Sequence, residues 1–270
     1  MSKEYDIIQS TPAPRTRESL AGDLRAIGLG PGMTVIVHTA MSRLGWVNGG
    51  AVALIQALMD ALTPEGTLVM PAHSGNLSEP SYWCNPPVPE SWQQTIRDTM
   101  PAYEPDITPT SGIGTVPELF RQFPCVLRSN HPQVSFTAWG KHADDITKGH
   151  RLEYSLGDGS PLARIYDLDG HVLLIGVGHD RNTSIHLAEY RANSRPLQRQ
   201  GAPVLENGAR VWKEYDDIEV DADCFPEIGE AFELTHPIVK RLVGSAECRL
   251  MRQRLLVDFA VEWFHSRSNR

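Results

Sequence analysis

A histidine and a glutamate stand three residues apart in the segment that runs from Asn182 to Arg191. On an α-helix, residues at this spacing lie on one face, where His186 and Glu189 can form a hydrogen bond. A carboxylate bonded to one ring nitrogen fixes the tautomer of the imidazole and leaves the other nitrogen to accept a proton. The pair therefore indicates a general base, although this spacing is also typical of a solvated helix face or a local hydrogen bond.

The preceding residues place this pair directly after a strand. Residues 172–178 are almost entirely apolar and include two glycines, a pattern typical of a buried strand that ends in a tight turn. A helix can then begin with Asn182, Thr183 or Ser184 as its cap. Because open α/β sheets place their chemistry at the carboxyl ends of strands, this position favours a catalytic role for the pair.

A second segment, residues 38–50, has the composition of an anion-binding loop. Small and hydroxyl-bearing residues follow one another there, and two glycines precede the next expected helix, so that backbone N–H groups and the positive helix end can converge on a phosphate. The segment lacks the Gly-Lys-Ser/Thr of a P-loop and the Gly-x-Gly-x-x-Gly of a dinucleotide site. An ordinary strand-to-helix loop is the alternative interpretation.

Hydrophobic patterning predicts the elements that carry these residues. A strand over 33–38, an apolar helix over 49–62 and a strand over 67–70 favour a parallel, right-handed crossover. Residues 74–110 are rich in proline and aromatic residues and resemble an irregular lid or binding loop. The other expected elements are helices over 16–27, 116–123, 141–148 and 246–264, and an antiparallel strand over 210–220.

These elements together predict an α/β fold. We expect a mostly parallel central sheet flanked by helices, an α/β/α sandwich, with a smaller antiparallel and irregular lobe that covers a cleft. The chain is long enough to bury a sizeable core, so we expect one domain over residues 1–270 that consists of two closely joined lobes.

Composition limits the classes of function. Of the 270 residues, 41% are hydrophobic and 21% are charged, which is typical of a globular protein. No apolar run reaches the roughly 20 residues of a membrane helix, and the N-terminus lacks the apolar segment of a signal peptide, so we expect a cytoplasmic protein that binds no membrane. A net charge of −8 argues against nucleic acid as a partner and favours cationic ligands. The four cysteines form no Cys-x-x-Cys pair, and no metal is expected.

The set of motifs resembles the aminoglycoside 3-N-acetyltransferase family, whose members depend on acetyl-coenzyme A. The matching segments are residues 38–50, 70–80, 110–121, 128–140, 157–162 and 176–191, which together extend over most of residues 15–260. The resemblance implies transfer of an acetyl group from acetyl-coenzyme A to the 3-amino group of a 2-deoxystreptamine aminoglycoside. It also implies that His186 is the general base and that Glu189 orients it. The sequence has no Gly-x-Ser-x-Gly elbow for a serine nucleophile, so we expect direct transfer through a ternary complex.

The resemblance assigns further residues to the two substrates. Coenzyme A is expected to contact the loop after the first strand, mainly through backbone, and the segment that follows the insertion. The residues of this cofactor-binding set are His38, Ser42, Arg43, Leu44, Gly45, Thr110 and Ser111. A polycationic aminosugar, or another small amine, calls for carboxylates in the receiving cleft. The residues of the substrate-binding set are Asn76, Glu79, Asp180 and Glu219.

Asn76 departs from the family pattern, because many members carry an aspartate in this loop. The loss of a negative charge there puts the range of accepted aminoglycosides in doubt. One alternative is therefore a coenzyme A-dependent N-acetyltransferase of the same fold whose acceptor is a different amine.

Two further alternatives belong to other classes of protein. A metal-dependent hydrolase could use ligands from the group His179, Asp180, His186 and Glu189, although their spacing matches no common metal motif. A module that only binds coenzyme A or a cation would have no need of a base. The exposed aromatic residues expected in the insertion, Tyr82, Trp83 and Trp92, suit either a lid or the contact of a homodimer.

Overall fold

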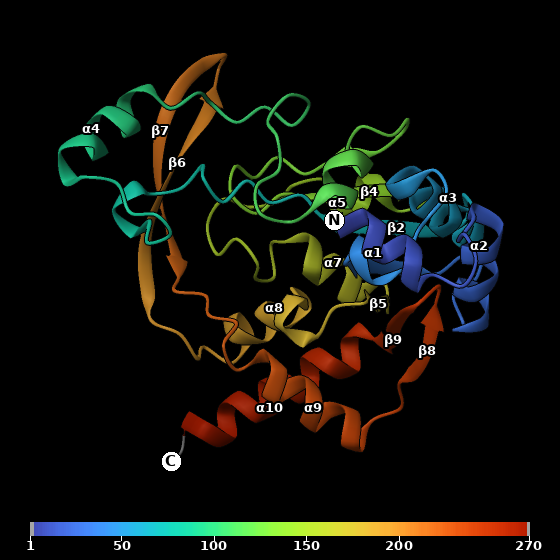
Figure 1. Ribbon diagram of the computed structural model, residues 1–270. Coiled ribbons are helices and arrows are strands. Elements are labelled where there is room, and N and C mark those ends of the chain that lie inside the picture. The colour runs from blue at the N-terminus through green and yellow to red at the C-terminus, as the bar shows by residue number, and fades with distance from the viewer. Residues whose placement is uncertain (1–2, 269–270) are drawn as a thin grey trace.

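The computed structural model describes residues 3–268, in which a seven-stranded sheet carries helices on both faces and a two-stranded ribbon lies beside it (Figure 1). The strands are β1 (Thr34–Thr39), β2 (Thr67–Pro71), β3 (Leu127–Arg128), β4 (Phe136–Gly140), β5 (His171–Ile175), β6 (Leu197–Glu206), β7 (Ala209–Ile218), β8 (Val239–Val243) and β9 (Ala246–Arg252). The α-helices are α1 (Lys3–Ser10), α2 (Arg17–Ala26), α3 (Gly50–Leu62), α4 (Glu90–Thr99), α5 (Thr115–Phe120), α6 (Ala143–Thr147), α7 (Pro161–Asp167), α8 (Ser184–Arg191), α9 (Phe225–Thr235) and α10 (Gln253–Ser268). Short 3-10 helices are η1 (Met41–Arg43), η2 (Pro80–Tyr82) and η3 (His179–Arg181).

The strands of the large sheet follow the order β3-β4-β2-β1-β5-β9-β8. At its centre, β1 pairs in parallel with β2 on one side and with β5 on the other. The strands β4 and β9 run antiparallel to their neighbours, so all the other strands of this sheet point in one direction. The predicted α/β fold, with its mostly parallel sheet, flanking helices and smaller antiparallel part, is confirmed.

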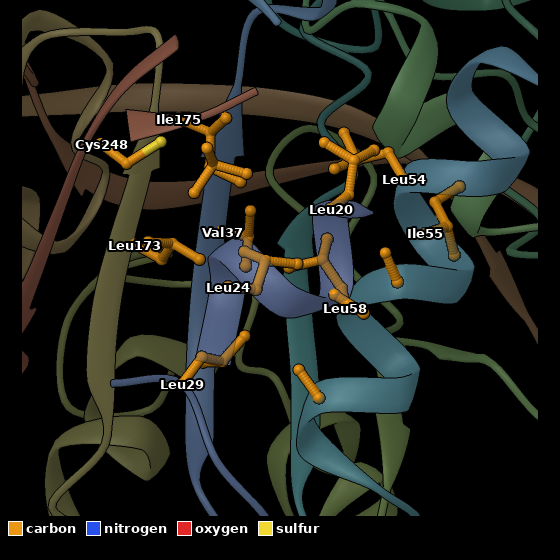
Figure 2. Packing of buried hydrophobic residues seen from close by; sticks show 14 of the residues in the cluster. Leu20, Leu24, Leu29, Val37, Leu54, Ile55, Leu58, Leu173, Ile175 and Cys248 are labelled. Atoms are coloured by element: carbon orange, nitrogen blue, oxygen red, sulfur yellow. The ribbon is translucent and has the colours of Figure 1, made fainter. Parts of the chain in front are cut away.

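Alternation along the strands divides the core into two layers. Val35 and Val37 of β1 pack with α2 and α3, whereas Ile36 faces the opposite layer with α7, α8 and α10. In the first layer, leucines of α2 and α3 meet Val37 and the β5 residues Leu173 and Ile175 (Figure 2). Each fully buried side chain of this kind stabilises the fold by about 1.5–3 kcal/mol, which makes the central strands a rigid support for the loops at their ends.

The C-terminal segment differs from the expected helix over 246–264. Its first residues form β9, which pairs with both β5 and β8, and only at Gln253 does α10 begin. Ala246, Cys248 and Leu250 are buried on alternate positions, which is the period of a strand rather than of a helix. The helix prediction was wrong for this part because the alternation is short and runs directly into the apolar residues of α10.

The insertion over 74–110 is more ordered than predicted. It contains α4, which lies beside the ribbon of β6 and β7 at the end of the molecule opposite α2 and α3 (Figure 1). Arg210 of β7 donates hydrogen bonds to the backbone carbonyls of Arg97 and Met100, and Tyr103 N–H donates to the carbonyl of Pro203 at 3.0 Å. The insertion and the ribbon thus form one lobe, the smaller antiparallel part of the fold.

Within residues 3–268, no helix has both the length and the apolar character needed to span a membrane.

Candidate active site

The carboxyl ends of β1, β2 and β5 open into a pocket of about 620 Å³. Its walls are formed by residues 37–42, 112–117 and 180–183, together with Pro71, His73, Val177, His186 and Phe225. The chain order reverses at this place, because β2 and β5 lie on opposite sides of β1. Open α/β sheets bind their ligands at such a switch point, and the loop predicted to bind an anion lies directly beside it.

His186 and Glu189 meet in this pocket as the sequence predicts. The Nδ1–H of His186 donates to Glu189 Oε2 at 2.5 Å, and the other carboxylate oxygen accepts from Arg195 Nε at 2.6 Å and from the backbone N–H of Asp221 at 3.3 Å. Glu189 is fully buried, and the His186 side chain is 15% exposed. The carboxylate holds one tautomer, which leaves His186 Nε2 with a free lone pair beside the pocket.

The elements around α8 explain how this geometry arises. After β5 the chain turns at Gly176, whose φ of 64° favours glycine, and passes through η3 into α8. The apolar residues Ile185, Leu187 and Ala188 are buried in the second core layer, which leaves His186 on the side of the pocket. The imidazole packs edge-on against Phe225 at 4.7 Å between centroids. Phe225 and Arg195 lie outside the recognised motif, and nothing in the sequence pattern singles them out.

The expected side-chain cap of α8 is not formed. Thr183 occupies the cap position without a side-chain hydrogen bond, and Asn182 turns toward η3, where its Nδ2 donates to His179 Nδ1 at 3.2 Å. His179 Nε2–H in turn donates to Glu233 at 2.9 Å. This second imidazole–carboxylate pair holds the loop before α8 and leaves the buried Asn182 Oδ1 without a partner.

Two more imidazoles line the pocket near His186. His38, near the end of β1, and His73, after β2, both carry a buried Nε2 that has no hydrogen-bond partner. Burial, and to a smaller degree the charge of His186, lowers the pKa of both rings to about 3. Both imidazoles are therefore neutral at pH 7, also when His186 carries a proton.

The predicted coenzyme A residues of the first loop fall into two groups. His38 and Ser42 line the pocket. Arg43, Leu44 and Gly45 do not: Leu44 is fully buried in the first core layer, and the Arg43 side chain is exposed. Gly45 has a φ of 84°, and a Cβ there would meet Thr11 and Ser245. Leu44 and Gly45 thus position the loop rather than line the pocket.

Thr110 and Ser111 also lie just outside the pocket lining, and the residues after them take their place. The backbone N–H and the hydroxyl of Thr110 both donate to Glu118 at 2.7 Å. Ser111 N–H donates to the carbonyl of His73 at 2.8 Å. These bonds fix the start of the segment 112–117, which lines the pocket. Gly112 and Gly114 have positive φ and open space where a Cβ would lie, so their backbone is accessible.

Of the predicted substrate-binding residues, Asp180 alone lines the pocket. Asn76 and Glu219 are exposed outside the lining. Glu79 is engaged within the insertion, because its carboxylate accepts from Arg97 at 2.5 Å and caps η2 at Ser81. The structure therefore places Asp180 beside the predicted base and the other three residues farther out.

Within the described residues, no group of three or more His, Cys, Asp or Glu side chains is placed to hold a metal ion. The two imidazoles of the hydrolase alternative are separately engaged, His179 with Glu233 and His186 with Glu189. The described residues thus form two separate imidazole–carboxylate pairs rather than a set of converging ligands.

Comparison with known proteins identifies the class to which this fold and pocket belong. The family model described as aminoglycoside 3-N-acetyltransferase matches residues 36–265. Among curated relatives, the SPbeta prophage-derived aminoglycoside N(3')-acetyltransferase-like protein YokD of Bacillus subtilis (strain 168) is 52% identical over 96% of this chain and 95% of its own. Aminoglycoside N(3)-acetyltransferase VII of Streptomyces paromomycinus is 35% identical over 99% of this chain and 97% of its own. The chain is thus an acyltransferase.

Solved structures give the same result. The crystal structure of YokD from Bacillus subtilis has a TM-score of 0.97 at 50% identity and covers 98% of this chain and 99% of its own. AAC-IIIb, solved as a binary complex with CoASH, has a TM-score of 0.84 at 30% identity over 94% and 98% of the two chains. AAC-VIa bound to sisomicin has a TM-score of 0.84 at 28% identity over 94% and 99%. The chain belongs to the aminoglycoside 3-N-acetyltransferase family.

Proposed function

We propose that this protein transfers the acetyl group of acetyl-coenzyme A to the 3-amino group of a 2-deoxystreptamine aminoglycoside, with His186 as the general base. The observation that carries the proposal is the hydrogen bond of 2.5 Å between His186 Nδ1 and the buried Glu189, in a pocket at the carboxyl ends of the central strands. Family membership supports the reaction, and this pair supports the assignment of its base.

The chemistry requires a base of this kind. An amine attacks a thioester carbonyl only through its lone pair, and the new N–C bond makes its remaining proton acidic. His186 Nε2 accepts this proton, and Glu189 stabilises the imidazolium that forms. The proton then passes to the sulfur of coenzyme A as the C–S bond breaks. Because His186 serves first as base and then as acid, no acetyl-enzyme is needed.

The pocket walls fit coenzyme A. A phosphate or an extended pantetheine arm can approach backbone groups on small or glycine residues of the pocket wall. These lie in residues 39–42 and in residues 112–117. Thr110 and Ser111 hold the second wall in place through Glu118 and His73. Leu44 and Gly45 do the same for the first wall, whereas the exposed Arg43 is free to meet a phosphate.

Acidic groups near the pocket suit a cationic acceptor. Asp180 is half-exposed in the lining, so its carboxylate can meet an ammonium group of the aminosugar, even though it also contacts Arg181 at 3.1 Å. Asn76 and Glu219 are exposed and remain candidates for outer rings of the acceptor. A homologue bound to sisomicin supports this class of acceptor.

Thiol release from acetyl-coenzyme A tests the proposal. We expect the wild-type protein to release thiol with 2-deoxystreptamine aminoglycosides, and His186→Ala to lower kcat by about 10²–10⁴-fold. A matched control is His142→Ala, because His142 forms an exposed pair with Asp145 at the same spacing and lies outside the pocket. This control should keep full activity.

Two results would count against the proposal. Turnover that survives in His186→Ala contradicts the assignment of the base. No turnover with any aminoglycoside, together with turnover of another amine, contradicts the assignment of the acceptor and supports a same-fold N-acetyltransferase with a different amine substrate.

A further inference from the structure

We propose that His38 is a catalytic residue that donates a ring N–H to the carbonyl oxygen of the acetyl thioester as that oxygen becomes negative. The inference rests on the proposed acetyl transfer and adds the group that stabilises the oxyanion. Removal of one such donor from an acyl-transfer site typically lowers kcat by about 10²–10³-fold.

The position of His38 places its ring at the reacting end of the pocket. It belongs to β1, pairs with Leu174 of β5, and lines the same pocket as His186. His38 is 8% exposed, and Nε2 is buried without a partner. Among the described residues, none donates to or accepts from this nitrogen. A buried polar group without a hydrogen-bond partner is energetically unfavourable, and a ligand that forms this hydrogen bond removes the cost.

The protonation state of His38 suits a donor rather than a base. Burial lowers its pKa to about 3, so the ring is neutral and carries one N–H at pH 7. A neutral imidazole can donate to a developing oxyanion without becoming the proton carrier, which is the separate role of His186. The two histidines thus have separate roles, since Glu189 bonds to His186 whereas no carboxylate within residues 3–268 bonds to His38.

Four other side chains near the pocket are less suited to this role. The Thr110 hydroxyl donates to Glu118 at 2.7 Å, and Ser111 lies outside the lining. Asn182 directs its Nδ2 to His179, and its unpartnered Oδ1 can only accept. His73 is also neutral and also lines the pocket, but it is less buried than His38 and its ring packs edge-on against Phe136 at 5.3 Å.

Each group has one task in the acetyl transfer. The lone pair of the acceptor amine forms the N–C bond, and the π-electron pair of the carbonyl moves to the oxygen, which accepts a hydrogen bond from the His38 N–H. His186 takes the proton of the amine. The oxygen pair then returns, the C–S bond breaks, and the departing sulfur takes the proton from His186. The products are the acetamide and coenzyme A, and His38 keeps its proton throughout.

A spectroscopic test needs no acceptor amine. Acetyl-coenzyme A labelled with ¹³C at the acetyl carbonyl is bound to the wild-type protein, and the carbonyl stretch is recorded by infrared difference spectroscopy. A donor aimed at the oxygen lowers this frequency relative to the free thioester. We expect a downshift in the wild type that is lost in His38→Leu, with the dissociation constant of acetyl-coenzyme A within about threefold of the wild type. The proposal would be overturned if His38→Leu bound acetyl-coenzyme A tenfold more weakly but left the carbonyl frequency of the bound thioester as it is in the wild type.

Kinetics with an accepted amine supply the second readout. We expect His38→Leu to lower kcat by about 10²–10³-fold with little change in either KM, and His38→Asn or His38→Gln, which keep an N–H, to recover at least part of that loss. Circular dichroism confirms that each variant is folded. A kcat of His38→Leu within threefold of the wild type, or amide variants no faster than leucine, would overturn the proposal. Inactivity of the wild type itself would instead count against the proposed acceptor, because the infrared result stands without turnover.

Discussion

The proposed role of His186 depends on a single neighbouring residue, Glu189. Its carboxylate is fully buried and contacts two side chains, the imidazole of His186 at 2.5 Å and the guanidinium of Arg195 at 2.6 Å. Arg195 donates to one carboxylate oxygen, and the other oxygen accepts the Nδ1–H of the imidazole, which holds that proton on Nδ1. The assignment of a base therefore depends on three side chains, of which the sequence motif contains two.

Glu189→Gln tests this dependence. A glutamine amide can donate as well as accept, so it no longer enforces one tautomer and no longer stabilises an imidazolium. We expect kcat to fall by about 10²-fold or more, measured by thiol release, with the KM for acetyl-coenzyme A nearly unchanged. The fold should survive, because Arg195 keeps its contact with Asp221 at 3.1 Å. A kcat within threefold of the wild type would show that Glu189 does not orient the base.

The sequence could identify His186 and Glu189 because helical spacing alone brings them together. It could not identify Arg195, which lies beyond the end of α8 and reaches back through a bend of the chain. Thr110 shows the opposite limit: its hydroxyl has the right chemistry for a ligand contact, but it bonds to Glu118, which only the fold brings close. Roles that depend on contacts between distant segments were beyond a reading of local patterns.

At the scale of elements, α9 carries a close contact that supports the pocket. A Cβ on Gly229 would lie 2.0 Å from the ring of His179, so only glycine lets α9 approach η3 this closely. His179 is the residue that holds Asn182 at the start of α8. The position of the helix that bears His186 therefore depends on the absence of a side chain on a neighbouring helix.

Gly229→Ala is expected to destabilise the fold. The added methyl forces His179 or α9 to move, and overpacking of this kind costs about 1–3 kcal/mol, read as a lower midpoint in urea. Gly22→Ala is the matched control, because Gly22 lies exposed within α2 and nothing stands within 4 Å of a Cβ there. The control should gain about 0.5–1 kcal/mol from helix propensity. Equal effects of the two substitutions would contradict the packing argument.

The elements differ in how well local pattern predicted them. Helices α2 and α3 and strands β1, β2 and β5 were found close to their observed bounds, because buried strands and amphipathic helices have clear periods. The hairpin of β6 and β7 was only half found, although Asn207-Gly208, both with positive φ, is a strong turn signal between two strands. The strand β9 was merged into a helix because its alternation is short.

Across the molecule as a whole, several histidines are buried in the neutral state. Burial lowers the pKa of His38 and His73 to about 3 and of His150 to about 4. His150 bonds to Ser129 at 2.9 Å and to the carbonyl of Ser155 at 2.7 Å, so its role is structural. The fold thus holds uncharged groups that an unfolded chain would protonate below about pH 6.5.

This difference predicts loss of stability in mild acid. Between about pH 6.5 and pH 3–4 the unfolded state binds more protons than the native state, so the free energy of unfolding falls as pH falls. Each such histidine contributes a slope of up to about 1.4 kcal/mol per pH unit in this range. Urea unfolding at pH 7, 5.5 and 4.5 measures the slope, and His150→Asn should reduce it. A free energy of unfolding that stays constant from pH 7 to pH 4.5 would contradict the neutral burial of these rings.

The fold class of the whole molecule was predictable because β-α-β order and buried strands imply a sheet with helices on both faces. The packing of α4 against the ribbon was not, because it depends on long-range contacts such as those of Arg210 with the carbonyls of Arg97 and Met100. The single domain of two closely joined lobes and the homodimer stay predictions. The proposed acetyl transfer, with His186 as the base, takes place in the pocket that this architecture forms.

The chemical structure of the acetylated product tests the proposed acetyl transfer. A 2-deoxystreptamine aminoglycoside is incubated with acetyl-coenzyme A and either the wild-type protein or His186→Ala, and the product is assigned by nuclear magnetic resonance. We expect one acetyl group, on the 3-amino nitrogen, with the wild type, and no detectable product with His186→Ala over the same time. An acetyl group on another nitrogen, or equal product from both proteins, would contradict it.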